Sequence, residues 1–187
     1  MSLSKKIVLG ITGASGSIYA HQLVNDILEY SDYHISIIYS ENGKKVWNYE
    51  LNLPILSETY RIKLYDNDDM FSAPASGSSM YDVMIIAPCS MGTLSQIANG
   101  LSYNLIGRSA DVMLKERKKL ILLIREAPYN LIHIQNMEKV TLMGGIIIPA
   151  SPAFYNNPKS ITDLVKSITD RILQMINIPV NIKEWGK

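Results

Sequence analysis

The feature that most constrains the fold is an alternation of short, mainly apolar segments with longer amphipathic ones. We expect strands at residues 6–11, 34–40, 61–65, 82–87, 120–124 and 145–148, and helices at 17–30, 43–51, 91–99, 104–117, 130–143 and 160–176. Strands that are apolar on both faces and alternate with helices form parallel sheets that are covered on each side. The sequence therefore predicts an α/β fold, a single doubly wound Rossmann-like (flavodoxin-like) domain over residues 1–187.

Composition excludes several classes of protein. The 187 residues carry a formal charge of +1 and only 19% of them are charged, whereas nucleic-acid binding needs clustered lysine and arginine. Cys89 is the only cysteine, which excludes a disulfide framework, and His21, His34 and His133 lack the spacing of metal ligands. No apolar run approaches the roughly 18 residues of a membrane span. Residues 1–6 lack a signal-peptide core, so we expect a cytoplasmic protein.

In this fold class ligands bind at the carboxyl ends of the strands, and the first strand ends in a glycine-rich turn. Residues 10–16 read Gly-Ile-Thr-Gly-Ala-Ser-Gly, with Thr12 and Ser15 as hydroxyl donors next to a helix N-terminus. A helix N-terminus attracts anions, and glycines allow close approach of the backbone. The spacing favours a phosphate or cofactor site. The alternative is a tight turn in which Ser15 is an ordinary helix N-cap.

The carboxyl ends of the next strands, called strand exits below, indicate which class of cofactor is bound. The second strand ends at Ser40, where an NAD-binding protein often carries an acidic residue; Glu41 keeps that alternative open, but the balance favours FMN. The fourth strand ends before Ser90, which either caps the following helix or, with Gly92 and Thr93, binds a second part of the cofactor.

Cys89 and the residues at 70–80 are two further candidates. Cys89 is expected to be a small buried side chain rather than a nucleophile. Residues 70–80, rich in Ala, Ser, Gly and Pro, are predicted to be a loop with a functional role.

Charged residues follow two patterns. Arg108, Asp111 and Lys115 share one face of a predicted helix, where an Asp111–Lys115 pair most often stabilises a solvated surface. The dipeptide Arg125-Glu126 instead follows a wholly apolar strand, so both charges lie at the ligand-binding edge. A guanidinium there suits a phosphate, and a carboxylate there suits proton transfer.

The last strand is followed by a proline-containing segment that ends at Tyr155, and the C-terminal helix carries Arg171 beside its apolar stripe. An arginine in that position usually extends its head into solvent, and the alternative is a phosphate ligand. From the residues alone, the chain is predicted to hold a flavin or nucleotide next to further anion-binding groups.

At these residues the chain resembles the flavin prenyltransferase (UbiX) family, whose members were formerly called aromatic acid or phenylacrylic acid decarboxylases. The matching segments are 10–16, 73–79, 88–94, 108–117, 125–128 and 152–155. The resemblance implies a metal-independent enzyme that transfers a dimethylallyl group from dimethylallyl phosphate to reduced FMN and closes a fourth ring. It also implies a homo-oligomer, a dodecamer whose sites are shared between subunits, and a partner UbiD-type decarboxylase that receives the prenylated FMN.

The resemblance also implies roles for individual residues. Its FMN contacts are Gly13, Ala14, Ser15, Ser40, Ser90, Met91, Gly92, Thr93 and Arg125; its groups for the prenyl phosphate are Arg108, Lys115, Tyr155 and Arg171; its catalytic residues are Ser15, Glu50, Glu126 and Tyr155. Two positions depart from the family's usual residues, Ala127 for Thr and Tyr129 for Leu.

Two other functions stay open. One is an FMN-dependent aromatic acid decarboxylase that acts directly; related enzymes use an active-site histidine, and none of the three histidines is predicted at a strand exit. The other is a non-catalytic flavin carrier, which would leave Lys115, Tyr155 and Arg171 without a role.

Overall fold

A computed structural model describes residues 5–180. Residues 1–4 and 181–187 lie outside the described residues, and the expectation of a cytoplasmic protein depends in part on residues 1–4. Six parallel strands form one sheet in the order β3-β2-β1-β4-β5-β6. The strands are β1 (Lys6–Ile11), β2 (His34–Tyr39), β3 (Ile62–Asp66), β4 (Val83–Cys89), β5 (Lys119–Ile124) and β6 (Ile146–Pro149). The predicted α/β fold class and parallel sheet are confirmed, and the strand order is that of the Rossmann fold.

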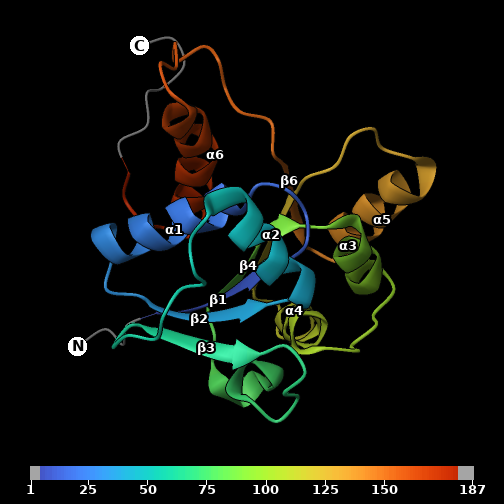
Figure 1. Cartoon of the computed structure of the whole chain (residues 1–187). Helices are drawn as coiled ribbons and strands as arrows, with labels where there is room; N and C mark the ends of the chain where they lie inside the picture. Colours follow the sequence, from blue (N-terminus) through green and yellow to red (C-terminus); the bar gives the residue numbers. More distant parts are fainter. Residues whose placement is uncertain (1–4, 181–187) are drawn as a thin grey trace.

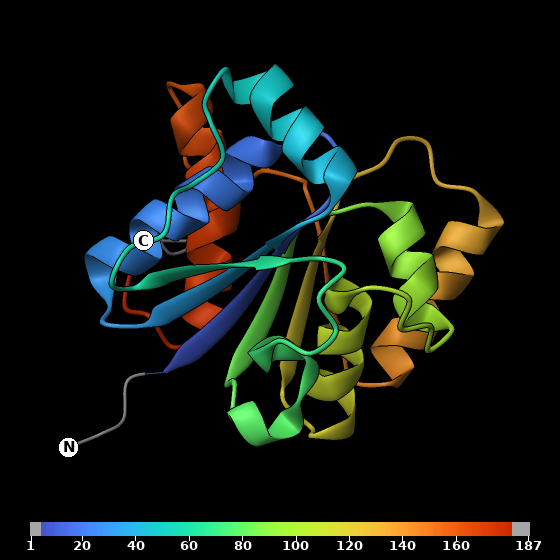
Figure 2. The same cartoon turned by 60° about the horizontal axis from the view of Figure 1, so that its bottom comes forward.

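Helices cover both faces of the sheet (Figures 1 and 2). On one face lie α1 (Ser17–Tyr30), α2 (Glu41–Leu51) and α6 (Ile161–Met175), and on the other lie α3 (Met91–Ala98), α4 (Leu105–Lys115) and α5 (Leu131–Leu142). Two separate apolar clusters form as a result, because successive strand side chains point to opposite faces. In β1, Leu9 belongs to the first apolar cluster, with Leu23 and Ile172, and Val8 belongs to the second apolar cluster, with Met113.

The structure differs from the predicted elements in two places. Strand β4 continues through Pro88 to Cys89, where residues 82–87 were expected, because Cys89 still pairs with Ile124 of β5. Residues 70–80 are not only loop, since they contain two 3-10 turns, Ala73–Ala75 and Gly77–Ser79. Over residues 5–180, no helix is both long and apolar enough to cross a membrane, as expected.

Candidate functional site

The exits of the two central strands are joined by one buried hydroxyl. Thr12, which follows β1, is 1% exposed. Its Oγ1 donates to the carbonyl oxygen of Pro88 at 2.7 Å and accepts from the backbone N–H of Ser90 at 2.8 Å. Thr12 was expected to offer its hydroxyl to a ligand; the structure instead shows that this hydroxyl fixes the β1 exit against the β4 exit.

The N-terminus of α1 is closed by a carboxylate from α2. Glu50 Oε2 accepts from the backbone N–H groups of Gly16 and Ser17, at 2.9 and 2.8 Å. Burial opposes the charge on Glu50, but hydrogen bonds from the Ser15 hydroxyl and from these N–H groups outweigh it, so the pKa of Glu50 is lowered. The alternative interpretation, in which Ser15 is an ordinary helix N-cap, does not hold, because Gly16 takes that position without a side-chain cap.

The glycines of this turn have structural reasons that need no ligand. A Cβ at Gly13 would lie 2.5 Å from the Cβ of Asn42, so the turn packs directly against the first turn of α2. Gly16 has a φ of 112°, in the left-handed region that favours glycine. Ala14 is 8% exposed and its side chain belongs to the buried apolar residues. The first turn therefore shapes the edge of the site.

Two other helix N-termini on the same edge are capped by serine. Ser40 Oγ accepts from the N–H of Gly43 in α2 at 3.0 Å, and Ser90 Oγ accepts from the N–H of Thr93 in α3 at 3.3 Å. The Ser40 hydroxyl, which accepts in this way, keeps its own proton for a further acceptor. The Ser90 hydroxyl lies 3.1 Å from Thr93 Oγ1, so these two hydroxyls together keep one proton for a further acceptor. A Cβ at Gly92 would meet nothing closer than 4.0 Å, so space is open in front of α3. The side chain of Met91, by contrast, is buried in the second apolar cluster.

The dipeptide after β5 lies beside this open terminus. The N–H of Arg125 donates to the carbonyl oxygen of Cys89, at 3.4 Å, and Arg125 and Glu126 are both exposed. Over residues 5–180, the Arg125 guanidinium forms no ion pair. Its charge acts on Tyr19 of α1, whose pKa is raised by burial and lowered in part by Arg125. Sequence reasoning missed Tyr19, since nothing in its local pattern marks it as part of this edge.

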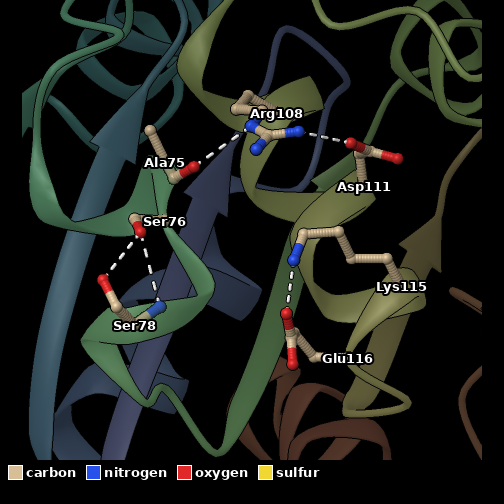
Figure 3. A network of polar contacts seen from close by, with 7 residues as sticks. All are labelled: Ala75, Ser76, Ser78, Arg108, Asp111, Lys115 and Glu116. Carbon is tan, nitrogen blue, oxygen red and sulfur yellow. Dashed lines mark hydrogen bonds and ion pairs between the residues drawn. The ribbon is translucent and has the colours of Figure 1, made fainter.

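The residues implied to hold the prenyl phosphate lie on two faces of the sheet. Figure 3 shows Arg108 and Lys115 on α4, where Arg108 donates to the carbonyl oxygen of Ala75 at 3.0 Å and pairs with Asp111 at 2.7 Å. Lys115 pairs with Glu116, so the Asp111–Lys115 pair expected from the spacing does not form.

Tyr155 and Arg171 lie on the opposite face. Tyr155 is 50% exposed in the segment after β6, and that segment is held to α6 because the N–H of Ala153 donates to Ser167 Oγ at 3.1 Å. Arg171 is exposed on α6 and donates to Gln174 at 3.2 Å. Figure 1 shows α4 and α6 on different sides of the sheet, so one chain does not bring the four groups together.

Cys89 and the three histidines are the remaining residues with side chains suited to catalysis, and their burial and position indicate structural roles. Cys89 is fully buried and burial raises the pKa of its thiol, which supports the expectation of a structural side chain. None of the three histidines lies at a strand exit: His34 begins β2, His21 lies within α1 and His133 belongs to the N-terminal capping box of α5.

The fold and this edge define the class of protein. A family model described as Flavoprotein matches residues 1–173. The chain is 43% identical over 183 residues to flavin prenyltransferase UbiX of Methanocaldococcus jannaschii, with 97% of this chain and 98% of the relative covered.

Two solved structures agree with that sequence match. The structure of AnUbiX (PadA1) in complex with FMN and dimethylallyl pyrophosphate has a TM-score of 0.91 at 32% identity and covers 97% of this chain and 99% of that one. The dodecameric FMN-dependent UbiX-like decarboxylase of Escherichia coli O157:H7 has a TM-score of 0.90 at 32% identity and covers 97% and 100%. The chain belongs to the flavin prenyltransferase (UbiX) family, a family of enzymes, as the resemblance predicts.

Proposed function

We propose that this chain transfers a dimethylallyl group from a dimethylallyl phosphate ester to reduced FMN. One observation carries the proposal: in a member of this family, two serine-capped helix N-termini and an arginine without an ion pair within residues 5–180 converge on the open carboxyl edge of the sheet. Each of these groups donates hydrogen bonds and favours a negative charge, as a flavin phosphate requires.

The residues on this edge fit FMN. The Ser40 hydroxyl, one hydroxyl of the hydrogen-bonded pair Ser90 and Thr93, and the Arg125 guanidinium provide donors for the phosphate. The turn that holds Gly13 and Ala14 borders the same space. Met91 contributes only through its backbone, because its side chain is buried. Reduced FMN, when bound, supplies the nucleophilic ring positions that accept the allyl group.

The second set of groups acts on the departing phosphate. When the allylic C–O bond breaks, its electron pair leaves with the phosphate oxygen, and negative charge develops there. Tyr155 and Arg171 of one copy stabilise that charge. Arg108 and Lys115 reach the same phosphate only from α4 of a neighbouring copy, because the two helices lie on opposite faces of one chain.

Closing the fourth ring would move a proton without net release, since the allyl double bond gains one and the flavin loses one, and three residues are proposed to handle it. Glu126 is exposed at the β5 exit, and Ser15 hydrogen-bonds to Glu50. Because its pKa is lowered, Glu50 is a weak base at neutral pH. We therefore assign Glu126 to proton uptake and Glu50 to the orientation of the Ser15 hydroxyl.

A site shared between copies requires an assembly, which we propose is the dodecamer seen in the Escherichia coli relative. Helix α5 supports a contact between copies, since Leu131, Ile132 and Leu142 are 66%, 59% and 80% exposed on it. Apolar side chains gathered on one surface element are typical of an interface. In this proposal a UbiD-type decarboxylase in the cytoplasm receives the product.

The experiment that tests the proposal uses two inactive variants. Arg171→Ala and Lys115→Ala should retain FMN but lose prenyl transfer by about 100-fold or more, measured as the mass of the extracted flavin after anaerobic incubation with dimethylallyl phosphate or pyrophosphate. Lys63→Ala, on the exposed edge strand β3, is the matched control and should keep full turnover. Full turnover in both test variants would discard the assignment.

Mixing the two variants tests whether the site is shared. If Arg171 and Lys115 of one site come from different copies, co-assembly of the two variants restores about a quarter of the sites under random pairing. If both groups come from the same copy, no mixed assembly contains an intact site, and activity stays at the level of the separate variants.

The two alternatives predict different products. A direct decarboxylase, as the name of the Escherichia coli relative states for that protein, would release carbon dioxide from an aromatic acid with FMN alone. A flavin carrier would bind FMN and return it unmodified. Mass analysis of the flavin, with carbon dioxide measured in the same reaction, separates all three functions.

A further inference from the structure

We propose that a second ligand site, specific for a small aromatic carboxylate, lies on the sheet face between β2 and β3. A cavity of about 500 Å³ opens there, a size typical of small-molecule sites. Its lining includes His34, Ser36, Tyr60, Lys63 and Tyr81. The proposal does not depend on prenyl transfer.

The cavity exists because no α-helix within residues 5–180 covers this part of the sheet. On the same face, α4 packs mainly on β4 and β5, while β2 and β3 are bordered by the two 3-10 turns that hold Ala73 and Ser79 (Figure 2). The strand side chains that face the cavity are polar, among them Ser36 and its register partner Lys63. Ile35 and Ile62 also line the cavity, although both belong to the apolar cluster on the other face of the sheet.

The cavity is separate from the flavin edge. Lys6 and His34 begin their strands and Tyr81 precedes β4, so this part of the lining lies toward the amino ends of the parallel strands. Tyr65 lies near the carboxyl end of its strand, but that strand is β3, at the side of the sheet away from β4 and β5. The flavin edge lies at the carboxyl ends. A six-residue strand spans about 20 Å, so a ligand the size of a single aromatic ring with a carboxylate does not reach both sites.

The floor of the cavity is a chain of hydroxyl groups. Ser36 Oγ lies 2.8 Å from the hydroxyl oxygen of Tyr81, and both residues are less than 9% exposed. Tyr81 is also hydrogen-bonded to Tyr65, whose ring lies 4.9 Å below the ammonium of Lys63. These hydroxyl groups are shielded from solvent, and they can hydrogen-bond to a polar substituent on a bound ring.

The charge of the lining selects an anion. Arg61 is committed elsewhere, because its guanidinium donates to the backbone carbonyls of Ile27, Leu28, Ser31 and Tyr33. Glu58, the acidic residue of the lining, accepts from the N–H of Leu64 at 2.9 Å.

Lys6 and Lys63 provide the free positive charge at the cavity. Lys6 donates to a carbonyl oxygen and Lys63 lies over a tyrosine ring; within the described part of the chain neither ammonium forms an ion pair. A carboxylate placed between them would supply the missing partner.

The aromatic side chains select a planar body. Tyr60 is 90% exposed at the cavity and its ring meets that of His34 edge to face, with centroids 5.5 Å apart. Together with Tyr65 and Tyr81 these rings line a space that suits a flat ring, since aromatic pairs favour edge and offset contacts. The combination of rings, two ammonium groups and a hydroxyl floor points to an aromatic carboxylate.

Calorimetric titration of the FMN-loaded protein tests the proposal with four probes. Benzoate should bind saturably, and 3-hydroxybenzoate should bind more tightly through the hydroxyl floor. Benzamide, which lacks the charge, and cyclohexanecarboxylate, which lacks the aromatic ring, should each bind at least 10-fold more weakly than benzoate.

Variants locate the site. Lys63→Ala should weaken benzoate at least 5-fold, and Ser36→Ala should remove the advantage of 3-hydroxybenzoate while benzoate still binds. Lys44→Ala, which removes a lysine paired with Glu41 on α2, is the control and should change neither. Absence of saturable binding, or benzoate binding that Lys63→Ala leaves unchanged, overturns the proposal.

A last variant separates this site from the flavin edge. Arg125→Ala should leave benzoate affinity unchanged, and benzoate binding lost in that variant but kept in Lys63→Ala would place the ligand at the flavin edge instead. Prenyl transfer should survive Lys63→Ala. Failure of the benzoate site therefore leaves the proposed function intact, and the reverse also holds.

Discussion

The N-termini of α1 and α3 lie at the same edge of the sheet, after neighbouring strands, yet one is closed and the other is open. Glu50 accepts from two backbone N–H groups of α1, so a carboxylate of the protein itself occupies the anion position. At α3, Ser90 satisfies one N–H and, among the described residues, no side chain blocks the space in front of Gly92. A glycine-rich turn before a helix is therefore not sufficient for a phosphate site, because a distant carboxylate can already fill it.

The two turns accordingly have different roles. The α1 turn positions Ser15 next to a fixed charge, and its glycines permit close packing against Asn42. The α3 turn, with Arg125 beside it, keeps donors available for a ligand. Three substitutions and one pH dependence test this division, from the largest expected effect to the smallest.

Removal of the arginine at the open end should have the largest effect. Arg125→Ala is expected to weaken FMN binding about 10- to 100-fold, the range for loss of a charge-assisted hydrogen bond. Titration of FMN against protein fluorescence measures it. The matched change at the closed end, Glu50→Gln, should alter FMN affinity only a few-fold, and a larger loss there than in Arg125→Ala would reverse the comparison.

Removal of the Thr12 hydroxyl, which joins the carboxyl ends of β1 and β4, should have the second-largest effect. Thr12→Val keeps the shape of the side chain but leaves the N–H of Ser90 without its acceptor. It also removes one of the two hydrogen bonds to the carbonyl oxygen of Pro88, which the backbone N–H of Thr12 still reaches at 3.3 Å. We expect a loss of about 1–3 kcal/mol in the free energy of unfolding, measured with urea. Thr141→Val, which removes an exposed hydroxyl on α5, is the control and should change stability little. Equal losses in the two variants would show that Thr12 has no special role.

Removal of the Glu50 charge at the N-terminus of α1 should lower the free energy of unfolding by a smaller amount. Glu50→Gln keeps an oxygen that accepts from Gly16 and Ser17 but removes the charge that favours the helix N-terminus. The expected cost is about 0.5–1 kcal/mol of unfolding free energy, because the carboxylate is partly exposed to solvent. Glu138→Gln, in the middle of α5, should cost almost nothing. A stabilised Glu50→Gln protein would contradict the account of α1.

The pH dependence of that cost gives the smallest and most specific effect. A carboxyl whose pKa is lowered on folding stabilises the folded protein above its unfolded pKa and loses that contribution as pH falls through the folded value. The difference in unfolding free energy between the natural protein and Glu50→Gln should therefore be constant near neutral pH. It should shrink as pH falls below the ordinary glutamate value of 4.5. A difference that stays undiminished well below the folded pKa of Glu50 would mean that charge is not its source.

Much of the fold could be predicted from local patterns. Buried strands such as β5 show as unbroken apolar runs, and their alternation with helices implies a parallel sheet. The residues of the edge were also found, since any side chain directly after such a strand lies there. Local patterns missed Tyr19, because its position near Arg125 depends on how α1 crosses the sheet. They also missed the cavity over β2 and β3, because its presence depends on which strands α4 covers.

The amino-acid sequence by itself determined the parallel sheet, the positions of its exits and the chemical groups at each exit, because the periodicity of apolar residues and the turn residues act over a few neighbours. Only the tertiary structure decided which helix terminus stays open, since Glu50 reaches α1 from 34 residues away in the chain. It also separated Arg108 and Lys115 from Tyr155 and Arg171, because α4 and α6 pack on opposite faces. Contacts of this kind depend on the path of the whole chain, which no local spacing contains.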